Sequence, residues 1–597
     1  MPVYTAPVKD TLFLLNNVLK LDSYSNLPGF AEATPDMVQA ILEQAASFTE
    51  EVVQPINQAG DEHGCTRHED GSVTTPPGFK EAYDQFCEGG WGTLTAPAAY
   101  GGQGLPYVLG TAFEEYLISA SLAFAMYPGL THGAVAAIEV VGSEEQKQKY
   151  LPNMISGKWC GTMNLTEPHC GTDLGLIRTK AEPQADGTYK ITGTKIFISA
   201  GEHDLAENIV HLVLAKMPAS PDNVKGISLF IVPKFLVNED GTLGERNAVS
   251  CGSIEKKMGI HGNSTCVLNY DGATGWLIGE KEKGLAAMFI MMNAARLGVG
   301  LQGLALSEVA YQNAAVYARE RIQGRALTGP ANPDAKADPI IVHPDVRRML
   351  MDIRAFNEGA RALALWAGLL VDLTSKAATE EDRQQADDLI GLLTPVIKGY
   401  FTDKGFENAV LAQQVFGGHG YIREHGMEQF VRDARIAQIY EGANGVQAMD
   451  LVGRKLARNG GRALQAFNKL IQEEIASAKG NEELKPLAES LERSLGHLQA
   501  ATMWLMQNAM ANPNNAGAAA YAYMHLAGLV SLGLMWLKIS KASLEAIAAG
   551  NGDERYYRNK LVAARYFVDR HLPDTASLRR KVEAGAETVM ALAAEDF

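Results

Sequence analysis

Apolar residues recur every three or four positions from about residue 36 to Pro152, which is the spacing of amphipathic helices. The first of these helices should begin at Thr34-Pro35, because threonine caps helix starts and proline suits the first helical position. Its predicted apolar face contains Met37, Ile41 and Ala45. A glycine-rich stretch, residues 88–104, interrupts the helical pattern.

After Gly161, apolar residues occur at every second position instead of every third or fourth. Short apolar runs are separated by glycine, proline and turns such as Asp186-Gly187, a pattern typical of β-strands. The alternating apolar positions are Tyr189, Ile191, Val210, Leu212, Leu214, Ile227, Leu229 and Ile231. No helical segment lies between these strands, so a βαβ dinucleotide fold is excluded for this part of the chain.

Helical spacing returns at Gly284 and continues to about residue 460, broken by a proline-rich loop at 327–346. This length predicts a bundle of four or five helices. A further helical segment follows, with breaks at Asn512-Pro513 and Leu572-Pro573. Its first apolar face should contain Leu464, Phe467, Ile471 and Ile475.

The chain is therefore expected to be mostly α-helical with a small central β-domain. At 597 residues it is too long for one core. We divide it into an N-terminal extension, a helical N-terminal domain, a middle β-domain, a helical bundle and an extra helical C-terminal domain, with bounds 1–35, 36–160, 161–280, 281–460 and 461–597.

Composition narrows the class of protein. The net charge of −16 argues against non-specific binding to nucleic acid or to an anionic membrane face. The six cysteines have no metal-ligand spacing, and their scarcity suits a reducing compartment. The N-terminus carries Asp10 beside a short apolar run and resembles a signal peptide poorly. No uninterrupted apolar run reaches about 18 residues. We expect a cytoplasmic protein with no bound metal and no stable membrane insertion.

A formal GxGxxG motif occurs at Gly298, Gly300 and Gly303, with the acidic residue Glu320 further on. A nucleotide-binding motif of this type must follow a strand, whereas these glycines lie inside a long apolar helical pattern. We interpret them as small residues that allow two helices to pack closely.

The stretch 414–447 contains the most informative chemistry. Gly417, Gly418 and Gly420 break a helical run and would let the backbone approach a bulky ligand. Glu441 follows the apolar residues Ile439 and Tyr440 and precedes Gly442. Such a carboxylate is either an ordinary helix-end glutamate or a base in a dry pocket, where desolvation would raise its pKa.

The segments QVFGGHGY (414–421) and RDARIAQIYEG (432–442) resemble the signature of the acyl-CoA dehydrogenase flavoprotein family. This resemblance implies that Glu441 is the catalytic base, and that Tyr440 and Gly442 contact substrate. It further implies that Gln414, Gly417 and Gly418 hold the adenine half of a neighbouring subunit's FAD. The family commonly has threonine in place of Ala443 and glutamine in place of Gly445, so Asn444, Ala443 or the backbone would supply cofactor bonds instead.

Two further segments resemble family motifs. MNLTEPHCGTDLG (163–175) is similar to a flavin-binding loop, and KIFISAGE (195–202) to a flavin-stacking strand, in which many members have tryptophan where this chain has phenylalanine. Arg296 is similar to a family arginine near the catalytic loop, which implies that it orders Glu441 or binds the substrate. Arg321 is similar to one that reaches the flavin pyrophosphate of a neighbouring subunit. The implied flavin contacts in the two segments are Leu165, Thr166, Gly171, Thr172, Phe197 and Ser199.

The resemblance spans about residues 36–450 and implies FAD-dependent α,β-dehydrogenation of an acyl-CoA, as in fatty acid β-oxidation, with electrons passed to an electron-transfer flavoprotein. The extension and the extra helices resemble a longer subgroup, often homodimeric, whose substrates are straight-chain acyl-CoAs or 3-(methylthio)propanoyl-CoA. An acyl-CoA oxidase that uses oxygen remains an alternative. A non-catalytic, DNA-associated relative is a second alternative, although the charge of −16 argues against it.

Overall fold

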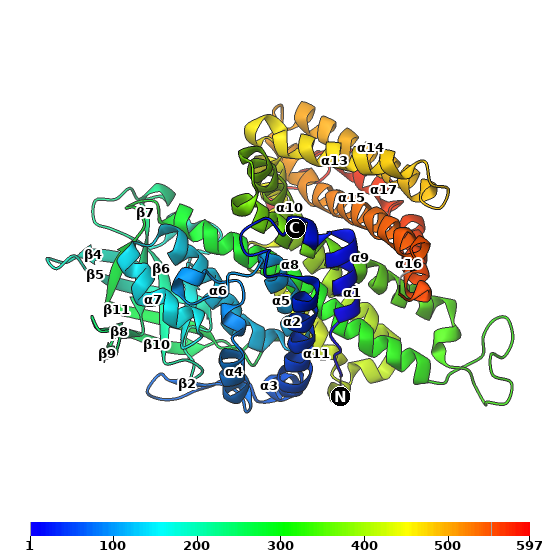
Figure 1. Cartoon of the computed structure of the whole chain (residues 1–597). Coiled ribbons are helices and arrows are strands. Elements are labelled where there is room, and N and C mark those ends of the chain that lie inside the picture. The colour runs from blue at the N-terminus through cyan, green and yellow to red at the C-terminus, as the bar shows by residue number, and fades with distance from the viewer. Residues whose placement is uncertain (1, 551) are drawn as a thin grey trace. The chain divides into compact units, whose positions relative to one another are not determined.

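The computed structural model describes residues 2–550 and 552–597, so that Met1 and Asn551 lie outside the described residues. The chain forms two compact units. Unit 1 comprises Met1–Ala46, Pro106–Ser119 and Val299–Phe597, and unit 2 comprises Ser47–Leu105 and Ala120–Gly298. Figure 1 labels most of the helices and strands, and its colour follows residue number from the N-terminus to the C-terminus.

Unit 2 contains a seven-stranded sheet with the order β10-β11-β5-β4-β6-β3, and β7 pairs with both β11 and β6. The strands β11, β5, β4, β6 and β7 therefore form a closed ring, within the small β-domain that the alternating pattern predicted. Its strands are β3 (Trp159–Asn164), β4 (Lys180–Pro183), β5 (Tyr189–Ser199), β6 (Asn208–Lys216), β7 (Ile227–Pro233), β10 (Val249–Ile254) and β11 (Thr265–Ile278). Two small hairpins are β1 (Thr66–Arg67) with β2 (Val73–Thr74), and β8 (Phe235–Val237) with β9 (Leu243–Arg246).

Strands β6 and β7 are buried on both faces. One face, which includes Leu212 and Leu229, packs with Ile138 and Leu151 of the helices α6 and α7. The other face, which includes Val213 and Phe230, packs inside the ring of strands. Both faces are apolar because neither meets water. The α-helices that lie wholly in unit 2 are α3 (Asn57–His63), α4 (Phe79–Glu88), α6 (Leu122–Val141) and α7 (Glu144–Ile155).

Unit 1 is helical. Its helices are α1 (Val8–Phe13), α9 (Pro344–Lys376), α10 (Glu380–Val415), α11 (Met427–Ala437), α12 (Asn444–Asp450), α13 (Arg462–Ala478), α14 (Lys485–Asn508), α15 (Pro513–Ala548), α16 (Glu554–Arg570) and α17 (Asp574–Glu583). Most of α2 (Pro35–Phe48) and of α5 (Tyr107–Ala120) also belongs to it, whereas α8 (Gly284–Glu320) begins in unit 2 and continues into unit 1. The predicted breaks at Pro513 and Pro573 coincide with the starts of α15 and α17.

The predicted apolar face of α2 is confirmed at Ala45, which is buried, and wrong at Met37, which is 49% exposed. Ile41 is half-buried, and the fully buried neighbours are Val38 and Leu42. The predicted and the buried positions both have helical spacing, so the pattern alone did not distinguish them.

The glycines of the GxGxxG motif lie inside α8, as predicted, and the last two face α10. A β-carbon on Gly300 would lie 2.6 Å from Ile397 Cγ2, and one on Gly303 would overlap the carbonyl oxygen of Phe401. Gly405 on α10 is equally close to the backbone of Gly303. The interpretation as a helix-packing motif is confirmed for this contact.

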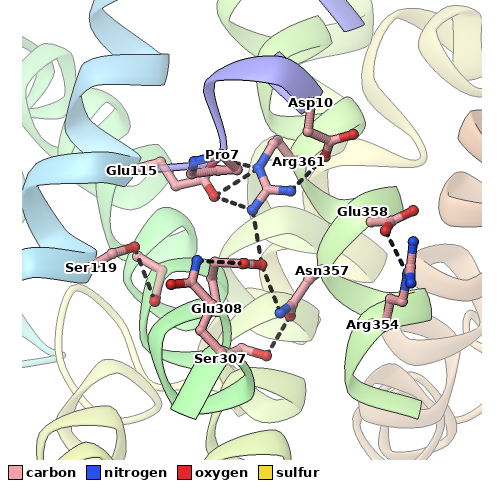
Figure 2. Close-up of polar contacts among 12 residues, drawn as sticks. Pro7, Asp10, Glu115, Ser119, Ser307, Glu308, Arg354, Asn357, Glu358 and Arg361 are labelled. Atoms are coloured by element: carbon pink, nitrogen blue, oxygen red, sulfur yellow. Dashed lines mark hydrogen bonds and ion pairs between the residues drawn. The ribbon is translucent and has the colours of Figure 1, made fainter. Parts of the chain in front are cut away.

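A buried ionic cluster joins the N-terminal extension to the bundle (Figure 2). The Arg361 guanidinium on α9 donates to Glu115 of α5 at 2.7 and 2.9 Å, to Asp10 of α1 at 2.7 Å and to Glu308 of α8 at 3.0 Å. Lys560 of α16 also pairs with Asp10. The Asp10 carboxylate of the extension thus binds both the bundle helix α9 and the C-terminal helix α16, a link that was not apparent from the sequence.

Three described helices, α6, α8 and α15, are long and apolar enough to cross a membrane by length and composition alone. The apolar windows of these helices are 56%, 50% and 78% buried inside the protein, respectively. The predicted absence of such segments rested on uninterrupted apolar runs, which is a stricter criterion than mean hydropathy over a window.

Candidate functional site

The predicted flavin loop of unit 2 is fastened to strand β5 by a buried ion pair. Lys195 Nζ lies 2.8 Å from the Glu167 carboxylate and donates to the carbonyl of Leu165 at 2.9 Å. The same carboxylate accepts the backbone N–H groups of Arg178 and Thr179. These contacts hold the loop beside β5. Neither Lys195 nor Glu167 was predicted as a functional residue, although both lie in the two quoted motifs.

Phe197 occupies a strained and exposed position on β5. The pairing of β5 with β11 slips between Ile198 and Lys195, where β5 has one residue more than its partner. This bulge contains Phe197, whose φ is +58° and whose side chain is 58% exposed. A left-handed phenylalanine costs about 1–3 kcal/mol, and bulges commonly re-aim a side chain next to a functional site. The bulge presents an aromatic face to the surroundings.

The predicted flavin loop of unit 2 carries polar groups close to β5. Thr166 is half-buried, and its carbonyl accepts the N–H of Ile196, which places the loop next to Phe197. Gly171 and Thr172 are exposed, and a β-carbon on Gly171 would meet only the Thr166 methyl, at 3.5 Å. Leu165 and Ser199 are half-buried. An exposed ring, beside a loop that carries two threonine hydroxyls and an open glycine, fits a planar ligand such as a flavin.

Arg296 lies in the unit 2 part of α8 and is buried rather than on the surface. Its guanidinium lies 5.7 Å from the centre of the Phe289 ring and 3.4 Å from Asn293 Oδ1. Both contacts come from the same helix and fix the direction of the arginine side chain.

The residues predicted to hold the adenine half of FAD gather in unit 1. Tyr317, one turn before the end of α8, stacks on Phe416 at 4.1 Å and bonds His419 at 2.8 Å. These contacts bring the end of α8, and hence the exposed Arg321, towards the turn that carries Gly417 and Gly418. Both glycines are exposed, and no atom lies within 4 Å of an added β-carbon on either. Gln414 is exposed at the end of α10.

Glu441 lies in a short loop of unit 1, residues 438–444, which we call the Glu441 loop. Glu441 is half-buried and has a φ of +56°, and Gly442 follows with a φ of +87°. Gln447 donates to the carbonyl of Glu441 at 3.1 Å, and Lys398 to the carbonyl of Gly442 at 2.8 Å. A left-handed glutamate persists only when its surroundings impose it, and these two bonds hold the backbone from which the Glu441 side chain projects.

Comparison with known proteins identifies the family. Four family models match consecutive parts of the chain: acyl-CoA dehydrogenase N-terminal domain (35–158), middle domain (162–273) and C-terminal domain (282–456), and acetyl-CoA dehydrogenase C-terminal like (467–593). The 3-methylmercaptopropionyl-CoA dehydrogenase of Ruegeria pomeroyi is 43% identical over 98% of this chain and 99% of its own. The chain belongs to the acyl-CoA dehydrogenase family.

A second relative supports this assignment, and a solved structure shares the fold. The broad-specificity linear acyl-CoA dehydrogenase of Mycobacterium tuberculosis is 34% identical over 99% of both chains. An acyl-CoA dehydrogenase of Bacillus anthracis, solved in complex with FAD, shares the fold with a TM-score of 0.74 over 92% of this chain and 88% of its own, at 22% identity. The predicted fold class and the assignment as an oxidoreductase are confirmed.

One predicted ligand of this acyl-CoA dehydrogenase needs correction. The side chain of Asn444 is buried and bonds Gly399, Thr402 and Asp403 of α10. Its backbone N–H donates to the carbonyl of Gln438. Asn444 therefore has its hydrogen-bonding groups engaged inside unit 1 and shapes the Glu441 loop. Ala443, by contrast, is exposed.

The hydroxyl of Tyr440 is also engaged, because it donates to the Gln302 side chain at 2.5 Å. Burial raises the pKa of Tyr440 well above its ordinary value, and the adjacent Glu441 raises the pKa further. The phenol therefore stays neutral, and a negative charge does not develop beside Glu441 on this side.

Proposed function

We propose that this acyl-CoA dehydrogenase oxidises the α,β carbon–carbon bond of an acyl-CoA thioester, with Glu441 as the catalytic base. The observation that carries this proposal is the left-handed backbone of Glu441, held by Gln447 and Lys398. An ordinary helix-end glutamate would not need such restraint. The half-buried position limits solvation of the carboxylate, which favours its action as a base.

In this mechanism Glu441 takes a proton from the α-carbon of the thioester. The backbone N–H of Glu441 donates to the thioester oxygen, which gains negative charge as the proton leaves. Bound FAD supplies the chemistry of hydride acceptance from the β-carbon. Exclusion of water around Glu441 keeps the carboxylate basic while the proton is transferred.

The chain offers residues that fit FAD in both units. In unit 2 the exposed face of Phe197 would pack on the flavin ring, and Thr166 and Thr172 would donate hydrogen bonds. In unit 1 Arg321 would pair with the phosphate of a neighbouring subunit's FAD, which suits a guanidinium, and the open backbone at Gly417 and Gly418 would accept the adenosine part of that same FAD. These assignments follow the family motifs and the exposure of each residue.

We propose 3-(methylthio)propanoyl-CoA as the substrate, because the relative named for this compound is more similar than the one named for linear acyl-CoAs. A panel of thioesters assayed on the FAD-loaded protein with an artificial electron acceptor tests this. Pentanoyl-CoA is the matched control, since it differs only by a methylene in place of sulfur. We expect similar kcat/KM for these two thioesters. For decanoyl-CoA we expect a value at least about 10-fold lower, because the substrate pocket would have to accommodate the additional methylene groups of the longer chain. Highest activity with decanoyl-CoA would instead support a straight-chain fatty acyl-CoA substrate.

The proposed electron acceptor is an electron-transfer flavoprotein. We expect protein reduced by substrate to stay reduced in air-saturated buffer for longer than one turnover, and to reoxidise promptly when electron-transfer flavoprotein is added. Stopped-flow absorbance of the flavin measures both reactions. Prompt reoxidation by oxygen alone would assign the protein as an acyl-CoA oxidase.

We further propose a cytoplasmic homodimer, with the five-part domain division given above. The region around Arg321 and Gly417 exposes the apolar side chains of Ile322, Leu327 and Tyr421. A second subunit that covers them would remove this apolar surface from water. The net charge of −16 supports the absence of nucleic-acid binding and of stable attachment to anionic membranes.

A further inference from the structure

Asp403 of α10 is a buried carboxylate that joins two parts of unit 1. It is 4% exposed. One of its oxygens, Oδ1, accepts from Gln438 Nε2 at 2.7 Å and from Asn444 Nδ2 at 2.7 Å. The other, Oδ2, accepts from the hydroxyl of Tyr521 and from His525 Nε2 at 2.8 Å. Both oxygens of this carboxylate are therefore paired.

The first pair of donors delimits the Glu441 loop. Gln438 is the first residue of the loop and Asn444 the last, and the N–H of Asn444 closes the loop by donating to the Gln438 carbonyl. Lys398, fully buried one and a half turns before Asp403, donates to Asn444 Oδ1 at 2.9 Å as well as to the Gly442 carbonyl. Asp403 thus binds residues at both ends of the Glu441 loop, and Lys398 binds Gly442 within the loop and Asn444 at its end.

The second pair of donors comes from the extra C-terminal helices. Tyr521 and His525 lie one turn apart on α15, within the part of the chain matched by the separate C-terminal family model. Burial by itself would raise the pKa of Asp403, but hydrogen bonds from His525, Tyr521 and Gln438 outweigh burial and hold this pKa below its ordinary value. Asp403 is therefore ionised, and charged hydrogen bonds are stronger than neutral ones.

We propose that the extra C-terminal domain positions the catalytic base: Tyr521 and His525 of α15 hold Asp403, and Asp403 holds the Glu441 loop. Tyr521, His525 and Asp403 are positioning residues, since they act on Glu441 through the loop. This inference rests on the proposed role of Glu441. It gives the extra C-terminal domain a part in catalysis.

Packing between α10 and α15 offers a purely structural alternative. The rings of Tyr400 and His525 are 5.3 Å apart, and Gly528 lies directly against Tyr400. These contacts would hold the two helices together without Asp403. Substitutions that keep ring shape and remove only the donor atom separate the two roles.

The variants are Tyr521→Phe, His525→Phe, His525→Gln and Asp403→Asn, all as FAD-loaded protein. Tyr523→Phe is the matched control, because it removes a buried hydroxyl from the same helix, where it bonds Thr502 at 2.7 Å and not Asp403. The measurements are the rate of flavin reduction by acyl-CoA, the KM, and the hydrogen–deuterium exchange of backbone amides in the Glu441 loop.

We expect Asp403→Asn to slow flavin reduction about 100-fold, because a small misplacement of a catalytic group has effects of this size. Tyr521→Phe and His525→Phe should slow it on the order of 10-fold, with little change in KM and with faster amide exchange in residues 438–444. His525→Gln should restore much of the rate, since its amide nitrogen can replace Nε2 as donor. Tyr523→Phe should leave both the rate and the loop exchange unchanged.

Two results would overturn the inference. Unchanged reduction rates and unchanged loop exchange in Tyr521→Phe and His525→Phe would show that Asp403 holds the loop without α15. An equal loss in Tyr523→Phe would show that α15 acts only through overall stability. A Glu441→Gln variant measured alongside separates these results from failure of the proposed base, because retained activity in that variant would contradict the role of Glu441 itself.

Discussion

Replacing Glu441 by glutamine is expected to lower the rate of acyl-CoA dehydrogenation by about 1,000-fold or more, within the range that general bases contribute. The amide has nearly the same shape as the carboxylate but does not take up a proton from the α-carbon. The backbone at residue 441 should keep its left-handed conformation, because the carbonyl groups of Glu441 and Gly442 that Gln447 and Lys398 bond are unchanged by the substitution. FAD binding should therefore be retained.

Anaerobic mixing of this variant with substrate provides the measurement. The visible flavin absorbance should remain unbleached in the variant and bleach in the unaltered protein. Glu473→Gln is the control, since Glu473 is an exposed glutamate on α13 whose nearest cation, Lys469, is 3.8 Å away. It should behave like the unaltered protein. Normal bleaching in Glu441→Gln would remove Glu441 from the role of base.

The motifs made part of the site predictable from sequence. Phe197 was predicted as a flavin contact on the motif alone, and the bulge that exposes its ring could not be predicted, because it depends on the pairing of β5 with β11. The alternation of β6 and β7 predicted strands, but their burial on both faces follows from closure of the ring through β7 and β11. Such pairings join residues distant in sequence, and periodicity carries no information on them.

The residues that support Glu441 carried no sequence signal. Lys398 and Asp403 lie in a long helix whose other charged residues, such as Lys404 and Glu407, form ordinary surface pairs. Asn444 was predicted as a cofactor ligand because it follows the motif, whereas its side chain points to α10. Burial distinguishes these cases, and burial depends on tertiary packing. Periodicity indicated that α15 exists, but not that two of its side chains reach Asp403.

Asp10 is another residue whose role came only from the structure. Its charge argued against a signal peptide, yet in the folded protein it accepts hydrogen bonds from Arg361, Tyr556 and Lys560. Lys560 and Arg361 hold the pKa of Asp10 well below its ordinary value, against the opposing effect of burial. A carboxylate near the N-terminus thus links α1 to α9 and α16. The extension is part of the folded unit, and its loss should weaken unit 1.

The second large effect is expected for Arg361→Met, which should destabilise unit 1 by about 3–5 kcal/mol, the usual cost of removing one partner from a buried ion pair. Arg361 is 2% exposed, and methionine fills much of its volume without donating hydrogen bonds. Glu115 and Glu308 would then lose a cation at 2.7 and 3.0 Å, respectively. Urea denaturation followed by circular dichroism measures the loss as a lower midpoint. Arg565→Met is the control, because the pair of Arg565 with Asp569 is exposed and worth about 0–1 kcal/mol.

The pH dependence of the stability lost in Arg361→Met shows whether the loss comes from unpaired carboxylates or from poorer side-chain packing. Burial already raises the pKa of Glu115 despite the opposing effect of Arg361, so without the guanidinium the pKa should rise further. A folded-state pKa above the unfolded value means that the folded protein binds more protons, and stability then falls as pH rises. The free energy of unfolding of Arg361→Met should therefore fall further below that of the unaltered protein at pH 8 than at pH 5. A deficit independent of pH would indicate that the lost stability comes from the shape of the side chain, and that the carboxylates around position 361 find other partners.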